Sequence, residues 1–257
     1  MKNNLALPIA ILIAGIIVGG AIFYNKKSSE PKNNRQTEQK QQQKLKLPSP
    51  ITKNDHVLGN PDAQLSMIEF SDTECPFCKR FQKTMKQVVD NYGKEGKVKW
   101  VYRHFPLDTL HSKSRKEAEA TECAAELGGN EKFWQYLDRI YEITPSNNGL
   151  DPKQLPKIAE YLKINKTDFE KCLASGKYAK KVEDNYQDGI RSGVRGTPHT
   201  VIIAKDGKNI SINGAFPYME TTPRLFYNPN FKEKENFCSK ETKLCGVKIA
   251  IDKLLKE

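Results

Sequence analysis

Two cysteines three positions apart, Cys75 and Cys78, most directly indicate chemistry in this 257-residue chain. A predicted strand ends shortly before them, and a predicted helix begins at them. A cysteine at a helix start faces unpaired backbone N–H groups and the positive end of the helix dipole, which favour the thiolate. Pro76 suits the first helical position, where an N–H would have no partner. The pattern predicts that Cys75 is a nucleophile and that Cys78 displaces whatever Cys75 captures.

Two other roles for the pair fit the sequence less well. A zinc site needs about four ligands. The nearest candidates, His104, His111, Cys238 and Cys245, do not follow a zinc-finger or zinc-ribbon spacing. A purely structural disulfide would not require the junction of a strand with a helix, which is the context that redox chemistry uses. We therefore expect a redox pair, no metal and no other cofactor.

Two further positions are expected to complete the site. The tripeptide Gly196-Thr197-Pro198 stands directly before a predicted strand, and an X–Pro bond there is a candidate cis peptide. A cis bond would turn the Thr197 backbone toward the cysteines, where it can pair with an extended peptide. Glu69 lies on a strand that is otherwise apolar. Buried there, its carboxylate would have a raised pKa and would take the proton of Cys78. On an edge strand it would instead point outward.

The elements that must position these residues alternate between strand and helix patterns. In chain order they are a strand over 64–70, a helix over 75–92, a strand over 97–103, a block of helices over about 112–192, a hairpin of strands 200–204 and 209–212, and a helix over 246–256. A β-α-β unit closed by a hairpin and a helix, with helices inserted in the middle, is an α/β layer fold.

The formal net charge of +11 would suggest a nucleic-acid partner, but the charge is concentrated near the N-terminus. Residues 25–54 carry +6, whereas residues 55–257 carry +4. Residues 25–54 are also rich in Lys, Gln, Asn and Ser and cannot bury a core. We therefore predict a flexible basic linker over 25–54 and no nucleic-acid binding.

Residues 1–24 contain an apolar run that is long enough to cross a bilayer. We expect an uncleaved N-terminal membrane anchor, with a cleaved secretory signal as the alternative. Both would send the rest of the chain across the membrane. Lys26 and Lys27 directly follow the run, whereas Lys2 precedes it. The positive-inside rule keeps the side with more lysines in the cytoplasm, so this arrangement argues against an exported domain. The expectation of a domain outside the cytoplasm therefore depends on the cysteine chemistry.

Several segments together resemble the DsbA-like family of thioredoxin-fold thiol-disulfide oxidoreductases, and most closely its membrane-tethered BdbD-type members. They are residues 55–63, 68–72, Cys75-Pro76-Phe77-Cys78, 103–107, 110–111, 133–134 and 194–198, which lie within about 55–216. The resemblance implies a thioredoxin fold with an inserted all-helical domain over 55–257. It implies a substrate-binding surface at Pro76, Phe77, Thr197 and Pro198. Reduced exported proteins would be the substrates, and a DsbB-like or VKOR-like membrane quinone reductase would reoxidise the pair.

Two residues depart from the family pattern. Phe77 stands where the strongest oxidants of the family carry His. A phenyl ring cannot hydrogen-bond the Cys75 thiolate, so we expect a less oxidising couple. His199 follows the proline where the family often has a small hydroxyl residue. We expect His199 to face solvent; the alternative is that it adds charge near the thiolate or meets the substrate.

The resemblance also implies that Cys123 and Cys172 are bonded to each other and brace the inserted domain. Two buried free thiols are the alternative, since free Cys packs as a small hydrophobic residue. Cys238 and Cys245 lie in a charged segment that the family pattern does not require. We expect a local disulfide there, as is common in an oxidising compartment.

Together these features predict an extracytoplasmic, membrane-anchored enzyme that introduces or exchanges disulfides in exported proteins through Cys75 and Cys78. We expect a monomer, since the sequence has no visible dimerisation domain. A disulfide reductase or isomerase of the same fold is the close alternative. A non-catalytic binding or chaperone module that retains a structural Cys75–Cys78 bond is the alternative from another functional class.

Overall fold

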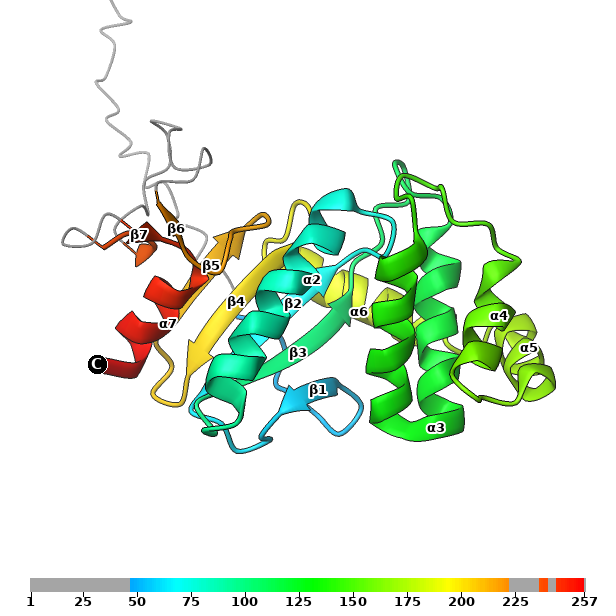
Figure 1. Ribbon diagram of the computed structural model, residues 1–257, viewed down its shortest axis with the longest axis horizontal. Helices are drawn as coiled ribbons and strands as arrows, with labels where there is room; N and C mark the ends of the chain where they lie inside the picture. Colours follow the sequence, from blue (N-terminus) through cyan, green and yellow to red (C-terminus); the bar gives the residue numbers. More distant parts are fainter. Residues whose placement is uncertain (1–46, 222–235, 240–243, 257) are drawn as a thin grey trace, which may run out of the picture. The chain divides into compact units, whose positions relative to one another are not determined.

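The computed structural model describes residues 47–221, 236–239 and 244–256 (Figure 1). These residues form a five-stranded sheet with helices on both faces, a group of helices beyond one end of the sheet, and a two-stranded sheet. In chain order the elements are β1 (His56–Gly59), β2 (Leu65–Ser71), α2 (Pro76–Val88), the π-helical turn η1 (Val89–Gly93), β3 (Val98–His104), α3 (Ser114–Ile143), α4 (Gln154–Tyr161), α5 (Lys166–Ser175), α6 (Ala179–Arg191), β4 (His199–Ala204), β5 (Asn209–Asn213), β6 (Glu220–Thr221), β7 (Leu244–Cys245) and α7 (Val247–Lys256).

The main sheet has the strand order β1-β3-β2-β4-β5, so β2 is its central strand. β2 and β3 are parallel and are connected by α2, whereas the other neighbouring strands are antiparallel. The predicted β-α-β unit, hairpin and final helix are therefore confirmed. β1 and the β6–β7 pair were not predicted. Each of these three strands is short, four residues or fewer, and carries little periodic signal.

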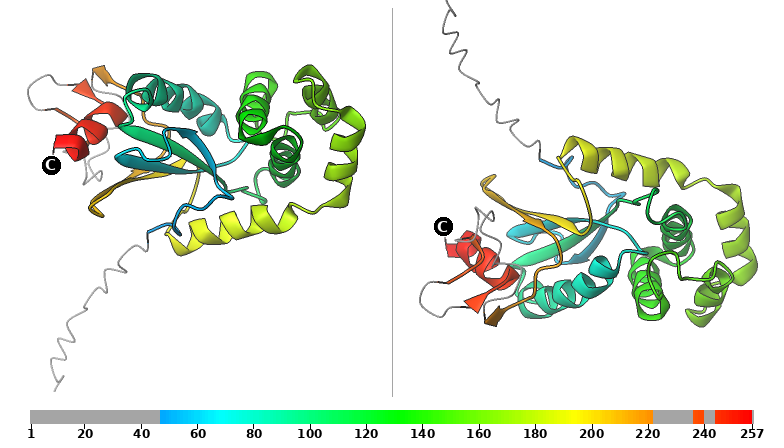
Figure 2. Two further views of the ribbon diagram at one scale, coloured as in Figure 1. Left: turned by 90° about the horizontal axis from the view of Figure 1, so that it is seen from below. Right: turned by 90° about the horizontal axis from the view of Figure 1, so that it is seen from above.

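Alternate residues of β2 contact different layers, because successive side chains of a strand point to opposite faces of the sheet. Leu65 and Met67 pack with Phe81 of α2 in the larger hydrophobic core, which α7 also joins. Ile68 and Phe70 belong to a smaller core on the other face. Figure 2 shows α6 on the side of the sheet opposite α2. Burial on both faces holds β2, and the residues that follow it, in one register.

The inserted helices α3, α4 and α5 have a core of their own. α3 reverses direction at Gly129, whose φ of 75° and ψ of −173° are non-helical, so it consists of two arms that lie side by side (Figure 1). A glycine adopts that backbone conformation without a steric penalty. The disulfide implied by the resemblance is present: Cys123 of the first arm is bonded to Cys172 of α5. Cys238 and Cys245 are bonded to each other as well.

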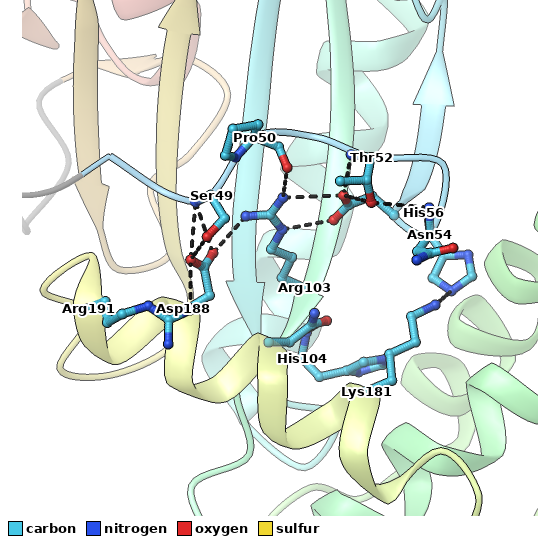
Figure 3. Close-up of polar contacts among 12 residues, drawn as sticks. Ser49, Pro50, Thr52, Asn54, His56, Arg103, His104, Lys181, Asp188 and Arg191 are labelled. Carbon is cyan, nitrogen blue, oxygen red and sulfur yellow. Dashed lines mark hydrogen bonds and ion pairs between the residues drawn. The ribbon is translucent and has the colours of Figure 1, made fainter.

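Residues 47–54, which we predicted as the end of a flexible linker, are packed against the domain instead (Figure 3). The backbone N–H of Ser49 donates to Asp188 of α6 at 3.1 Å, and Arg103 of β3 donates to the carbonyl of Pro50 at 3.4 Å. Arg103 is 3% exposed and is held between Asp55 and Asp188 at N···O distances of 2.8 and 2.7 Å. A buried charge requires such partners. The prediction is therefore wrong for Ser49 and Pro50, because hydrogen bonds to Asp188 and Arg103 hold their backbone against the domain.

The predicted anchor over 1–24 and the rest of the predicted linker lie outside the described residues. Within the described ranges, none of the helices combines the length and the apolar character that a bilayer span requires.

Replacing both Cys123 and Cys172 by alanine should lower the free energy of unfolding by about 4 kcal/mol, because the bond closes a loop with a sequence separation of 49. The bond between Cys238 and Cys245, with a separation of 7, provides the matched control, and its double replacement should cost about 2 kcal/mol. Urea unfolding followed by circular dichroism measures both losses. A larger loss for the shorter loop would contradict the chain-entropy explanation.

Candidate functional site

Cys75 lies at the end of the short connection from β2 to α2. It directly precedes Pro76, the first residue of α2, and its backbone is extended, with φ −77° and ψ 120°. Its N–H donates to the carbonyl of Asp72 at 3.1 Å, and its carbonyl accepts from the N–H of Lys79 at 3.0 Å. The sulfur of Cys75 is therefore held at the N-terminal end of α2, where the backbone N–H groups of the first turn are directed at it.

The two sulfurs have different electrostatic surroundings. The pKa of Cys75 is lowered to about 6, chiefly because the Cys78 thiol hydrogen-bonds it. Burial raises the pKa of Cys75, whereas the Thr197 side chain and the backbone N–H groups of Cys78 and Phe77 lower it further. Cys78 is fully buried, and burial together with its hydrogen bond to Cys75 raises its pKa well above the ordinary value. At neutral pH the arrangement holds Cys75 as the thiolate and Cys78 as the thiol.

The loop before β4 faces Cys75 from a distant part of the chain. The Thr197–Pro198 bond is cis, and the protonated Cys75 thiol donates to the Thr197 carbonyl with an S···O distance of 3.5 Å. The Pro198 carbonyl accepts from the N–H of Gly214 at 2.9 Å, which ties the loop to the end of β5. The structure thus brings together the two motifs that the sequence singled out.

Glu69 lies on the central strand β2 and is fully buried, so the alternative of an outward-facing edge residue is wrong. Burial raises its pKa to about 7; the side chains of Ser71 and Trp100 lower it somewhat, and the charge of Cys75 raises it. Among the described residues, neither carboxylate oxygen has a partner at hydrogen-bonding geometry. The charge of Glu69 also raises the pKa of Cys78. A carboxyl group that titrates near neutrality beside a buried thiol is suited to exchange a proton with it.

The residue before the nucleophile is tied to the inserted helices, which sequence reasoning did not anticipate. Glu74 is completely buried. Its carboxylate accepts from the backbone N–H groups of Gly149 and Leu150 at 3.1 and 3.2 Å, in the loop that follows α3. Its carbonyl accepts from the N–H of Asn147 at 2.8 Å. The loop after α3 therefore helps to fix the backbone on which Cys75 is mounted.

Two further acidic residues complete this buried cluster. Burial, and the adjacent carboxylate of Glu74, raise the pKa of Glu117 to about 9, and the Thr73 hydroxyl donates to it at 2.6 Å. Asp72 accepts from the N–H of Leu107 at 2.7 Å and pairs with His111 at 3.0 Å. Burial alone would lower the pKa of His111, but the hydrogen bond and charge of Asp72 raise it overall. The contacts join residues far apart in sequence, so no local pattern indicated them.

The two residues that depart from the family pattern differ in exposure. Phe77 is 53% exposed beside Cys75, and the guanidinium of Arg80 lies 5.3 Å from the centre of its ring. His199 is 4% exposed, so the expectation that it faces solvent is wrong. The reason is that β4 lies between β2 and β5 and is covered on both faces. Burial lowers the pKa of His199, although the hydrogen bond that its imidazole donates to the Asn213 side chain raises it, so His199 adds no positive charge near the thiolate at neutral pH.

Comparison with known proteins identifies the family to which the chain belongs. A family model described as thioredoxin (Thioredoxin_4) matches residues 51–215. The chain belongs to the thioredoxin family.

Two solved structures show which thioredoxin-family proteins the fold is similar to. DsbA2 from Pseudomonas aeruginosa is 26% identical with a TM-score of 0.57, over 65% of this chain and 90% of that one. Oxidised BdbD from Bacillus subtilis is 25% identical with a TM-score of 0.55, over 63% of this chain and 87% of that one. The resemblance stated from the sequence is confirmed, and the chain is a DsbA-like thiol-disulfide oxidoreductase.

Curated relatives with another description also match part of the chain. The Na(+)/H(+) antiporter NhaA 1 of Mycolicibacterium gilvum (strain PYR-GCK) is 31% identical over 162 residues, which is 63% of this chain. The chain covers 25% of that antiporter's length. The match therefore concerns one portion of a longer protein, and antiport activity is not assigned to this chain.

Glu117→Gln should change how stability depends on pH. The pKa of Glu117 is raised from 4.5 to about 9, so the stability contributed by its protonated form is fully present below about 4.5 and is lost as the pH rises through about 9. Between these values the folded state holds a proton that the unfolded state lacks, and stability falls by about 1.4 kcal/mol per pH unit from this group. Glutamine removes this contribution to the slope.

Urea unfolding of the reduced protein across this pH range measures the slope. Glu142→Gln is the matched control, because the Glu142 side chain lies on the same helix and is 66% exposed. Equal slopes for Glu117→Gln and Glu142→Gln would show that Glu117 does not hold a proton in the folded state.

Proposed function

We propose that the chain is a dithiol oxidase for exported proteins. The observation that carries this proposal is the contrast between the two sulfurs, with the pKa of Cys75 lowered to about 6 and that of Cys78 raised. A stabilised Cys75 thiolate stabilises the reduced enzyme, and this makes the Cys75–Cys78 disulfide a good acceptor of two electrons. The disulfide form would therefore oxidise a dithiol substrate.

The catalytic cycle follows from the positions of the groups. A substrate thiolate attacks the Cys75 sulfur, the Cys75–Cys78 bond breaks, and the electron pair leaves on Cys78, which takes a proton from Glu69. A second substrate thiolate then attacks the substrate sulfur bonded to Cys75. The substrate disulfide forms, and Cys75 leaves as a thiolate, which its low pKa makes a good leaving group.

Substrate binding is assigned to the exposed surface around Cys75. Thr197 presents its backbone carbonyl to the nucleophile and can pair with an extended peptide, with Pro198 fixing the loop. Pro76 and Phe77 directly follow Cys75 and are exposed, and the Phe77 ring offers an apolar contact that tolerates many sequences. Such a surface suits reduced, unfolded chains.

The redox potential is expected to be intermediate. The pKa of the reactive cysteine is roughly 3.5 in DsbA and roughly 7 in thioredoxin, and the reduction potentials of these two proteins are roughly −120 and −270 mV. With a pKa of about 6, Cys75 lies between these limits. Phe77 in place of a histidine is consistent with that position, since it cannot donate a hydrogen bond to the thiolate.

We further propose that residues 1–24 anchor the chain in the cell membrane, with the catalytic domain on the extracytoplasmic side. The two structural disulfides, Cys123–Cys172 and Cys238–Cys245, support an oxidising compartment. A DsbB-like or VKOR-like membrane quinone reductase would then reoxidise the Cys75–Cys78 pair. The enzyme would act as a monomer.

The direct test mixes the oxidised protein with reduced, unfolded ribonuclease A and counts substrate thiols over time. The wild-type protein should remove two thiols for each Cys75–Cys78 disulfide consumed. Cys78→Ala and Cys75→Ala, neither of which can form the Cys75–Cys78 disulfide, should remove no substrate thiols. The control variant, with Cys238 and Cys245 both replaced by alanine, should retain activity.

Equilibration with glutathione measures the reduction potential of the same samples. A value near that of thioredoxin, together with insulin reduction and no oxidation of ribonuclease, would contradict the oxidase proposal and favour a reductase. An unreactive Cys75–Cys78 bond would instead indicate a non-catalytic binding module.

A further inference from the structure

A buried imidazole lies among the acidic side chains that surround the turn before Cys75. The Nδ1 atom of His111 pairs with the carboxylate of Asp72 at 3.0 Å, and both side chains are almost completely buried. Burial, and the neighbouring charges of Glu74 and Asp72, raise the pKa of Glu117 to about 9, so Glu117 is protonated at neutral pH. His111 is therefore placed to balance acidic charge close to the nucleophile.

Asp72 connects His111 to the backbone of the nucleophile. Its carbonyl accepts from the N–H of Cys75 at 3.1 Å, and its Oδ1 atom accepts from the N–H of Glu74 at 2.8 Å. Its Oδ2 atom accepts from the N–H of Leu107 at 2.7 Å and pairs with His111. One residue thus holds both the turn that ends at Cys75 and the imidazole, so the imidazole keeps a fixed position relative to that turn.

The charges of His111 and Cys75 act on each other. Burial lowers the pKa of His111, but the hydrogen bond and charge of Asp72, the charge of Cys75 and a hydrogen bond with the Asn147 side chain raise it overall. A coupling between two sites is reciprocal, so the imidazolium lowers the pKa of Cys75 by the amount that the thiolate raises the pKa of His111. The Cys78 thiol remains the largest stabiliser of the thiolate, and the contribution of His111 is the smaller one.

Two lysines near this turn have other partners. The ammonium groups of Lys79, on α2, and Lys113, directly before α3, donate to backbone carbonyls at 2.5 and 2.8 Å. Histidine is the side chain whose ordinary pKa lies within the physiological pH range. The charge of His111 can therefore change when the charge of Cys75 changes.

We propose that His111 is a positioning residue whose protonation is linked to the redox state of the Cys75–Cys78 pair. Its imidazolium stabilises the Cys75 thiolate of the reduced enzyme, and this favours acceptance of electrons by the disulfide. The effect on the reduction potential rests on the proposed dithiol oxidation. The sequence offered His111 only as a zinc ligand without a matching spacing, because its contact with Asp72 depends on tertiary packing.

The redox step balances with His111 as a proton acceptor. A substrate dithiol becomes a disulfide and gives up two electrons and two protons. The Cys75–Cys78 bond breaks and takes both electrons, which leaves a thiolate at Cys75 and a thiol at Cys78 that takes one proton. His111 takes up part of the second proton, because the new thiolate raises its proton affinity, and the solvent takes the rest. Reoxidation of the pair releases that part again.

Histidine NMR of the full-length protein measures this linkage directly. The chain has four histidines, and with isotope-labelled histidine their titration is followed from about pH 5 to about pH 10 in the oxidised and the reduced protein. The midpoint of His111 should be higher in the reduced protein by roughly half a pH unit, about threefold in proton affinity. Cys75→Ala should abolish this difference, because it removes the thiolate.

Two other buried histidines are internal controls in the same spectra. Burial and the neighbours Glu122, Lys181 and His56 determine the pKa of His104, and burial together with Asn213 determines that of His199. Their midpoints, where they titrate, should be the same in both redox states.

A second measurement removes the charge of His111 and follows Cys75. In His111→Asn the amide can still donate to Asp72 in place of Nδ1, but it carries no charge. The thiolate midpoint of Cys75 should rise from about 6 by roughly half a pH unit. Equilibrium with glutathione at neutral pH should shift toward the Cys75–Cys78 disulfide by roughly two- to threefold.

His104→Gln is the matched control variant. Its amide can donate to Glu122 in place of the His104 Nε2 atom, which lies 3.0 Å from that carboxylate. It should leave both the thiolate midpoint and the glutathione equilibrium at wild-type values. Loss of folding is recognised separately, because an unfolded variant exposes both thiols and forms two thiolates near the ordinary cysteine pKa.

The outcomes separate this inference from the proposed function. Equal His111 midpoints in the two redox states, or a Cys75 midpoint that His111→Asn leaves unchanged, would overturn the linkage, while oxidation of ribonuclease by the wild-type protein would still support the oxidase. If both midpoints shift as expected but the oxidised protein leaves the ribonuclease thiols intact, the linkage stands and the proposed oxidase fails.

Discussion

Two sulfur atoms one helical turn apart compete for one proton, and the fold decides which sulfur keeps it. Cys75 is at the N-terminal end of α2, where backbone N–H groups, the Thr197 side chain and the Cys78 thiol stabilise its negative charge. Cys78 is fully buried among apolar side chains and close to Glu69, so it remains protonated. This difference makes Cys75 both a reactive nucleophile and a good leaving group, and it makes Cys78 dependent on a proton acceptor.

The inserted helices contribute to the active site directly. The loop after α3 binds the carboxylate and the carbonyl of Glu74, which precedes the nucleophile. The Thr144 carbonyl at the end of α3 accepts from the Lys79 side chain at 2.5 Å, within the first turn of α2. The hydroxyl of Tyr141, on α3, lies 3.1 Å from the hydroxyl of Ser71 at the end of β2. The thioredoxin sheet provides the strand and the helix between which the cysteines lie, and the insertion holds the connection between them in place.

The residues of the site differ in how far they could be predicted from the sequence. Cys75, Cys78, the Thr197–Pro198 loop and Glu69 are marked by local features: a strand followed by a helix, a proline before a strand, and an acid within an apolar strand. Glu74 and Glu117 carry no such mark, because their environment is created when α3 packs against the cysteine segment. Tyr141 likewise looks like one more apolar position of a helical stripe.

The errors have the same origin in tertiary packing. His199 was expected in solvent, because neighbouring strands on both sides of β4 cannot be inferred from β4 alone. Residues 47–54 have the composition of a linker, yet Ser49 and Pro50 are hydrogen-bonded to Asp188 and Arg103, and these partners are known only once β3 and α6 are placed. Fold class and catalytic pair depend on local periodicity and spacing, whereas buried polar partners depend on contacts between distant segments.

Titration of the reduced protein, followed by the ultraviolet absorbance of the thiolate, shows which sulfur holds the proton. We expect one thiolate to form with its midpoint near pH 6. We also expect Cys78→Ala to move this midpoint upward, because the Cys78 thiol is the main stabiliser of the Cys75 thiolate. A midpoint close to the ordinary cysteine value of about 9, or one that Cys78→Ala leaves unchanged, would contradict the unequal sharing of the proton between the two sulfurs.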